Sequence, residues 1–201
     1  MKPFKPKVMK KLYLFFILIL AWSCNDLYVV PETQYQIPQG QHESRVVGGF
    51  FGDKMRTLKN DYMSFTARFD ETARYDLQNN DQDDINKLMG FADANSLHHD
   101  NSIRFGWRYS IPKDAIEIFG YAYQDGVLNF EYITDIAIHE TAEFKIQLTE
   151  QSYVLQVKGE TTLEMERMVR NTVGVYYLLF PYFGGNEPAP HDVNIFIKEN
   201  F

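Results

Sequence analysis

The sequence predicts an all-β domain in which two antiparallel sheets pack face to face as a sandwich, with one or two short helices. Apolar and polar residues alternate with a period of two over several segments, and these segments are rich in β-branched and aromatic residues. Turn residues recur about every eight to twelve positions, which is the spacing expected of short antiparallel strands. We expect about eight to ten strands, and the absence of a disulfide framework favours a sandwich over a small barrel.

The alternation identifies the individual strands. It occurs in residues 62–70 (YMSFTARFD), 143–149 (EFKIQLT), 152–160 (SYVLQVKGE) and 192–199 (DVNIFIKE). The best helix candidate is residues 80–91 (NDQDDINKLMGF), where acidic residues cluster in a first turn and Ile85, Leu88 and Met89 share a face. Residues 161–169 (TTLEMERMV) fit a strand and a helix equally well.

The N-terminus has the organisation of an export signal. Five lysines precede an unbroken apolar run, Leu12–Trp22, which is too short for a membrane span. The chain's one cysteine, Cys24, follows at the expected cleavage point, so the segment resembles a bacterial lipoprotein signal in which Cys24 is lipidated. An ordinary secretory signal with an incidental cysteine is the alternative. We therefore expect a signal peptide at 1–23, a flexible tether at 24–45 and the sandwich at 46–201, with an edge strand near the end of the tether as an option.

Charge limits the partners of the mature chain. The full sequence carries 20 basic and 27 acidic residues, and removal of the five lysines in residues 1–23 changes the net charge from −7 to −12. This field repels nucleic acid, which is not expected as a partner.

The segment 103–109 (IRFGWRY) is the most informative part of the chain. A turn at 112–114 and the Asp125-Gly126 hairpin signal predict that Arg108 lies opposite Glu117, Gly106 opposite Phe119 and Arg104 opposite Tyr121. Phe130 then lies beside Tyr121, and Tyr132 beside Phe119. Both faces of this sheet are apolar or aromatic, whereas a half-solvated sheet alternates with polar residues.

Two interpretations of the second face stay open. In one, it is a ligand groove: Arg104 and Arg108 contact carboxylates or sulfates of a glycan, Gly106 leaves space for a sugar ring, and the rings stack on sugars. Its binding residues are Arg104, Arg108, Tyr121, Tyr123 and Tyr132. In the other, the rings belong to the core between the sheets, Glu117 neutralises Arg108, and Arg104 extends over a tyrosine.

The histidine pairs and the acidic segment 79–84 are weaker candidates for a functional site. His98-His99-Asp100 precedes the arginine strand but lacks a third metal ligand, so a solvated loop is favoured and no metal residue is assigned. His139-Glu140 is a candidate acid–base pair, and His191-Asp192 is expected to fix its loop. Residues 79–84 fail the EF-hand pattern.

Two resemblances add expectations. Residues 175–199 (VYYLLFPYFGGNEPAPHDVNIFIKE) resemble the end of concanavalin-A-like lectin and glucanase jelly rolls, which implies a jelly-roll fold. The resemblance also implies that a structural calcium ion is possible, since such sandwiches often carry one. No other cofactor is expected. The strings RFGWR and YFGGN make the chain similar to uncharacterised exported lipoproteins of Bacteroidota, which implies a lipid-anchored location in the bacterial cell envelope, with the outer membrane favoured.

The catalytic motifs of such folds are incomplete. The glucanase string Glu-x-Asp-x-x-Glu is absent. Jelly-roll alginate lyases offer a partial match through Arg104 and Arg108, the Ala137-Ile138-His139 segment, and Tyr176. We therefore expect a lipid-anchored domain that binds a polysaccharide or glycoconjugate without catalysis. The alternatives are a polysaccharide lyase or glycoside hydrolase using His139, Arg104 and Tyr176, and an assembly subunit with a protein partner in the envelope.

Overall fold

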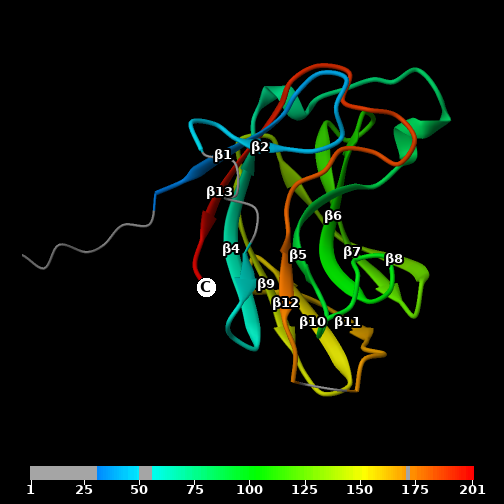
Figure 1. Cartoon of the computed structure of the whole chain (residues 1–201). Coiled ribbons are helices and arrows are strands. Elements are labelled where there is room, and N and C mark those ends of the chain that lie inside the picture. Colours follow the sequence, from blue (N-terminus) through cyan, green and yellow to red (C-terminus); the bar gives the residue numbers. More distant parts are fainter. Residues whose placement is uncertain (1–30, 50–55, 171–172) are drawn as a thin grey trace, which may run out of the picture.

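Two antiparallel sheets lie face to face and form the sandwich (Figure 1). The computed structural model describes residues 31–49, 56–170 and 173–201. The seven-stranded sheet contains, in spatial order, β11 (Thr161–Glu166), β10 (Ser152–Val157), β9 (Thr141–Leu148), β4 (Tyr62–Phe69), β13 (Val193–Glu199), β1 (Thr33–Ile37) and β2 (Arg45–Val46). The six-stranded sheet contains β3 (Thr57–Leu58), β12 (Tyr176–Leu179), β5 (Asn86–Ala92), β6 (Ser102–Ser110), β7 (Ala115–Gln124) and β8 (Val127–Ala137). The expected two-sheet architecture is confirmed.

The core fills the space between the sheets with side chains from alternate strand positions. The Phe65 ring in β4 stacks on Phe144 in β9 with centroids 5.1 Å apart, and both rings meet Phe105 of β6 edge-on at 6.1 and 5.0 Å. All three are fully buried. Such aromatic contacts add to the burial of apolar area, so this cluster couples the two sheets.

The expected helices are wrong. Residues 80–91 form a short 3₁₀ turn, η2 (Asn80–Asp83), followed by β5, and the ambiguous segment 161–169 begins as β11. The Asn79 side chain caps the turn by accepting from the Asp81 backbone N–H at 2.9 Å, and the backbone becomes extended at Asp84. Tertiary packing explains the difference, because Leu88 and Met89 enter the inter-sheet core through a bulged strand. The other 3₁₀ turn is η1 (Glu71–Ala73).

The tether boundary also needs correction. Residues 33–37, expected within a flexible tether ending at 45, form β1, which pairs with both β13 and β2. Tyr35 and Ile37 of this strand are buried in the core, so the folded domain includes them. Cys24 and the signal segment 1–23 lie outside the described residues. No helix within the described ranges is long and apolar enough to cross a membrane.

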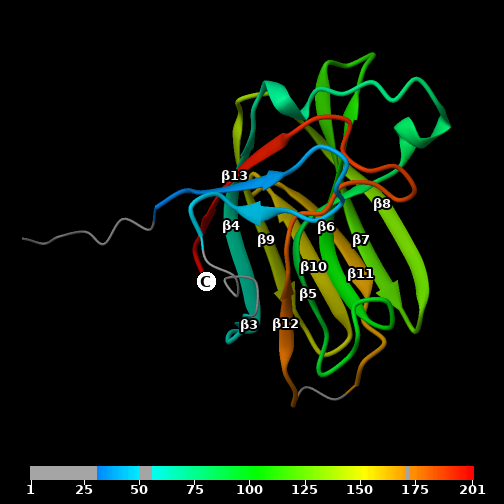
Figure 2. The same ribbon diagram turned by 45° about the horizontal axis from the view of Figure 1, so that its top comes forward.

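Loops from both halves of the chain meet at one end of the sandwich. Figures 1 and 2 show the segment with η1 and η2 next to the returning segment 180–192. Asn186 N–H donates to Asp84 at 3.3 Å, and the His191 ring donates to the Thr72 carbonyl at 2.8 Å, so His191 fixes its loop as expected.

A buried ion pair joins the ends of the two sheets. Arg167, after β11, donates to both carboxylate oxygens of Asp93, after β5, at 2.7 and 2.8 Å. The Tyr153 hydroxyl in β10 donates to the same carboxylate at 2.5 Å. Both ionic side chains are fully buried, so each depends on the other for compensation of its lost hydration.

We predict that Asp93→Ala lowers the free energy of unfolding by about 3–5 kcal/mol, because it leaves the Arg167 charge buried without its partner. Urea unfolding followed by circular dichroism measures the effect. The matched control is Glu166→Ala, which breaks the exposed pair of Glu166 with Arg170 and should cost less than about 1 kcal/mol. Equal losses in the two variants would contradict the importance of the buried pair.

Candidate functional site

The outer face of the six-stranded sheet, turned away from the seven-stranded sheet, carries the aromatic residues predicted to be special. The strand register is confirmed: Arg104 lies opposite Tyr121, and Tyr121 lies opposite Phe130. The inner face of β6 contributes Ile103, Phe105 and Trp107 to the inter-sheet core. Phe119 and Tyr121 instead form a separate small cluster with Ile85. The interpretation that placed these rings between the sheets is therefore wrong.

Arg104 is the unusual residue on this face. Its exposed fraction is only 8%. Among the described residues no hydrogen bond or ion pair to its guanidinium is found, and its Nε is buried without a hydrogen-bond partner. Burial lowers the pKa of Arg104 to about 10, while the nearby hydroxyls of Tyr121, Tyr123 and Tyr182 act in the opposite direction. A buried cation without a counter-charge is costly, which makes Arg104 the strongest candidate for an anion-binding group among the described residues.

Gly90 brings the neighbouring strand close to Arg104. A Cβ atom at Gly90 would overlap the Arg104 backbone and Cβ, so no larger residue fits there. The register of β5 against β6 shifts between Lys87 and Gly90, which is a bulge. Bulges redirect side chains, and this one leaves Lys87 on the outer face beside Arg104.

Lys87 is the second cation of the site. Its Nζ donates to the Gly184 carbonyl at 2.5 Å and lies 5.2 Å from the Tyr121 ring centroid and 5.5 Å from that of Tyr182. Burial, together with the positive charge of Arg104, lowers the pKa of Lys87 to about 8. We call Arg104, Lys87, Tyr121, Tyr123 and Tyr182 the Arg104 site.

The returning segment 180–192 supplies Tyr182 to the site. The backbone N–H groups of Lys87 and Tyr182 donate to each other's carbonyls at 2.8 and 2.9 Å, which docks this segment against β5. The His42 ring stacks on Tyr182 with centroids 5.3 Å apart, and its Nδ1 is bonded to the Phe183 carbonyl at 2.9 Å. Residues far apart in the sequence are thus brought to one site.

Two histidines lie along the rim of the Arg104 site. The His99 ring packs on Tyr123 at 5.1 Å and on His98 at 4.0 Å. The Ser102 hydroxyl donates to the His98 carbonyl at 2.7 Å and so holds this loop against β6. Burial, His99 and Arg104 together lower the pKa of His98. Both histidines are exposed, as expected of a solvated loop, and the lowered pKa favours the neutral His98 ring.

Arg108 differs from Arg104 in having partners. Its Nε donates to Glu117 at 2.5 Å, its Nη1 donates to the Asp83 carbonyl at 3.0 Å, and its guanidinium lies 5.1 Å from the Phe119 ring centroid. Its charge is thereby compensated within the protein. The space expected above Gly106 is also filled, because a Cβ there would come within 2.5 Å of Ile85. The expectation of a sugar ring at Gly106 is wrong.

The three tyrosines chosen from the sequence have different exposures. Tyr121 is 5% exposed, Tyr123 is partly buried, and Tyr132 is 47% exposed. Lys113 lies over the Tyr132 ring, 5.1 Å from its centroid. The structure therefore brings together Arg104, Tyr121 and Tyr123, whereas Arg108 and Tyr132 lie along the same face with partners of their own.

The alternative catalytic set is not assembled. His139 lies at the exposed turn between β8 and β9, where its ring pairs with Glu71 at 3.0 Å. Tyr176 packs on Phe91 in the inter-sheet core and its hydroxyl accepts from Arg167 at 3.3 Å. Neither side chain reaches Arg104 on the outer face.

Sequence reasoning missed Lys87 and Tyr182. Lys87 lies in a segment interpreted as a helix, so its position next to Arg104 was hidden. Tyr182 belongs to the quoted string YFGGN, which was used only as a fold signal.

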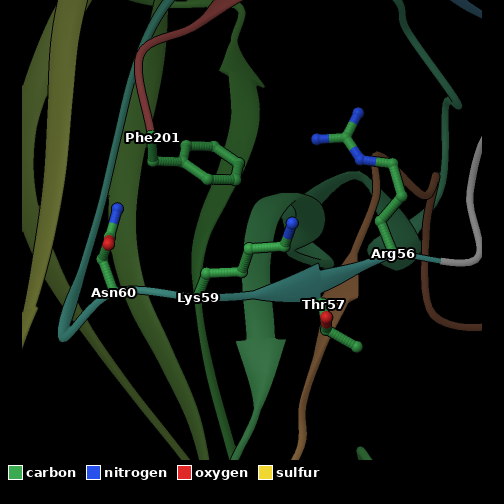
Figure 3. A pocket seen from close by; sticks show the side chains of 5 residues that line it. All are labelled: Arg56, Thr57, Lys59, Asn60 and Phe201. Atoms are coloured by element: carbon green, nitrogen blue, oxygen red, sulfur yellow. The ribbon is translucent and has the colours of Figure 1, made fainter.

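A different hollow is the cavity of about 500 Å³ next to β3 (Figure 3). Arg56, Thr57, Lys59, Asn60 and Phe201 line it. Arg56 is paired with Glu199, so its charge is already compensated. The described ranges contain no group of three or more side chains able to hold a metal ion. The Arg104 site is therefore the stronger candidate.

Comparison with known proteins identifies the fold class. No family model and no curated protein matches the chain. Among solved structures, the alginate lyase AlyC3 is 8% identical, with 83% of this chain and 73% of that one covered and a TM-score of 0.56. An endo-acting O-glycanase, expressed by members of the human gut microbiota to initiate mucin breakdown, is 10% identical, with coverages of 84% and 76% and a TM-score of 0.52. A glycoside hydrolase family 16 endo-glucanase from Bacteroides ovatus is 7% identical, with coverages of 83% and 78% and a TM-score of 0.49. At such identities the similarity to the alginate lyase and the O-glycanase shows the fold alone, a jelly-roll sandwich, in agreement with the resemblance carried by residues 175–199.

We predict that Arg104→Met raises the pKa of His98, because a positive charge that disfavours the imidazolium is removed. A pH titration of the histidine ring resonances by NMR measures it. Arg45→Met, which removes an exposed arginine in β2 of the other sheet, should leave the His98 titration unchanged. An identical His98 pKa in the wild type and in Arg104→Met would show that the two groups are not coupled.

Proposed function

We propose that this protein binds an acidic polysaccharide or glycoconjugate on the outer face of its six-stranded sheet, with a carboxylate or sulfate of the ligand at Arg104. The observation that carries the proposal is the buried guanidinium of Arg104, which lacks a counter-charge among the described residues. A bound anion would form charge-assisted hydrogen bonds with it and relieve the cost of its burial. The positive charge of Lys87 would add to the attraction.

The side chains around Arg104 favour a saccharide over a small inorganic anion. The partly exposed Tyr123 and Tyr182 offer ring surface for the C–H groups of a sugar and hydroxyls for its oxygen atoms, whereas the buried Tyr121 packs edge-on against Tyr123 and restricts the orientation of that ring. The whole chain carries a net charge of −7, so the cationic Arg104 site is a local exception rather than part of a basic surface. The shared fold of the alginate lyase and the O-glycanase is compatible with the proposal but supports it by association only.

The location of the protein forms part of the proposal. We propose that Cys24 anchors the domain to the bacterial cell envelope through lipid, as the export signal in the sequence indicates. An anchored binding domain would retain glycans at the membrane surface.

We predict that alginate, polygalacturonate or chondroitin sulfate binds in isothermal titration, and that neutral laminarin and dextran do not. Arg104→Met should weaken binding by about 10- to 100-fold, because a hydrogen bond to a charged group contributes about 1.5–3 kcal/mol. Arg45→Met serves as the control for loss of one positive charge. If no acidic polymer binds, or if both variants bind like the wild type, the assignment of the Arg104 site is wrong.

Lys87 favours a second candidate function, a polysaccharide lyase. With a pKa of about 8, a fraction of Lys87 is neutral at neutral pH and able to accept a proton. In β-elimination, Lys87 would take the C5 proton of a uronate whose carboxylate is held by Arg104. The C4–O bond then breaks, the C4=C5 double bond forms, and the leaving oxygen takes a proton from water.

This second candidate predicts new absorbance near 235 nm when an acidic polymer is incubated with the protein. The rate should rise with pH through about 8, as Lys87 loses its proton. Lys87→Met should abolish the absorbance change. Binding of the polymer with no absorbance change at any pH would leave binding without catalysis as the function.

A further inference from the structure

The edge strand β8 carries exposed rings on the same outer face as the Arg104 site. β8 is the last strand of the six-stranded sheet, and residues 127–132 are all exposed. Leu128, Phe130 and Tyr132 project to the outer face, because they lie opposite Tyr123, Tyr121 and Phe119. Figure 2 shows β8 at the margin of the sheet. Exposed large apolar side chains on an edge strand are unusual and point to an interaction.

Phe130 is in register with the Arg104 site. Arg104, Tyr121 and Phe130 occupy facing positions on the successive strands β6, β7 and β8. Adjacent strands are about 4.8 Å apart, so Phe130 lies about 10 Å from Arg104 across the sheet. The almost buried Tyr121 lies between them and makes the surface continuous.

The Phe130 ring is held in one orientation by a neighbouring ring and is exposed to solvent. Its ring meets the buried Phe119 ring at 82°, with centroids 6.4 Å apart, a contact that restricts its orientation. Phe130 is 56% exposed. Tyr132 differs, because the Lys113 ammonium lies over its ring, while burial and a hydrogen bond with Asp135 raise the pKa of its hydroxyl. Of the two rings, Phe130 is the one with a free face.

We infer that the ligand is an oligosaccharide that crosses the strands, with its acidic residue at Arg104 and a further sugar ring stacked on Phe130. This inference rests on the proposed function and specifies it: the recognised unit is longer than one sugar and combines an anion with an apolar sugar face. The continuity of the surface from Arg104 through Tyr121 to Phe130 favours a single extended ligand over a separate protein partner at β8.

The test compares ligand lengths. Tetrasaccharides of galacturonate, mannuronate and chondroitin sulfate, with the matching monosaccharides, are titrated by calorimetry and NMR. Phe130→Ala should weaken tetrasaccharide binding about tenfold and leave monosaccharide binding unchanged. Val127→Ala is the matched control, because Val127 is 61% exposed on the same strand but faces the other side. Thermal unfolding confirms that each variant is folded.

The outcomes separate the two proposals. Loss of tetrasaccharide binding in Arg104→Met, with wild-type binding in Phe130→Ala, would overturn the stacking inference and leave the proposed function standing. If none of the saccharides binds to the wild type, the proposed function fails and this inference fails with it. Equal weakening in Phe130→Ala and Val127→Ala would also overturn the inference, because the effect would then belong to the strand and not to the ring.

Discussion

The alternation of β6 between two environments determines most of what is distinctive about this protein. Ile103, Phe105 and Trp107 enter the core between the sheets and are fully buried, which fixes the strand in position. The residues between them, Arg104 and Arg108, must then emerge on the outer face. Because Tyr121, Tyr123 and Lys87 also occupy that face, a cation that would be solvated on an ordinary sheet becomes buried.

Two buried arginines illustrate two uses of the same chemistry. The charge of Arg167 is compensated by Asp93, whose carboxylate also accepts a hydrogen bond from Tyr153, and this buried pair joins the ends of the sheets and stabilises the fold. Arg104 has no such carboxylate within the described part of the chain, although it is nearly as inaccessible. A buried charge without compensation lowers the stability of the fold, and under the proposed function a ligand anion would supply that compensation.

Distant segments build the outer face together. The bulge at Gly90 turns Lys87 outward, the closing segment adds Tyr182, and the loop before β6 adds His98 and His99. Each is held by backbone or side-chain hydrogen bonds, so the cationic centre is largely preorganised. The exposed ring of Phe130 lies at the free edge of the same surface. The result is a graded face, ionic near the middle of the sheet and apolar at its margin.

The sequence alone determined the strands with strict alternation and the register of the β6–β7–β8 hairpins, because period-two patterning and turn residues act locally. It also singled out Arg104 and Tyr121. The helix predicted for residues 80–91 was wrong, because the helical spacing of Ile85, Leu88 and Met89 is outweighed by packing on both faces of a bulged strand. The tether predicted for residues 33–37 was also wrong, because this polar segment becomes a strand by pairing with the last strand of the chain. The same register placed Arg108 opposite the Glu117 that neutralises it. Only the tertiary structure decided which face of the sheet is covered, and therefore that no carboxylate of the described residues reaches Arg104. The physical reason is that compensation of a charge depends on atoms from segments far apart in the chain, and no local pattern specifies where those atoms meet.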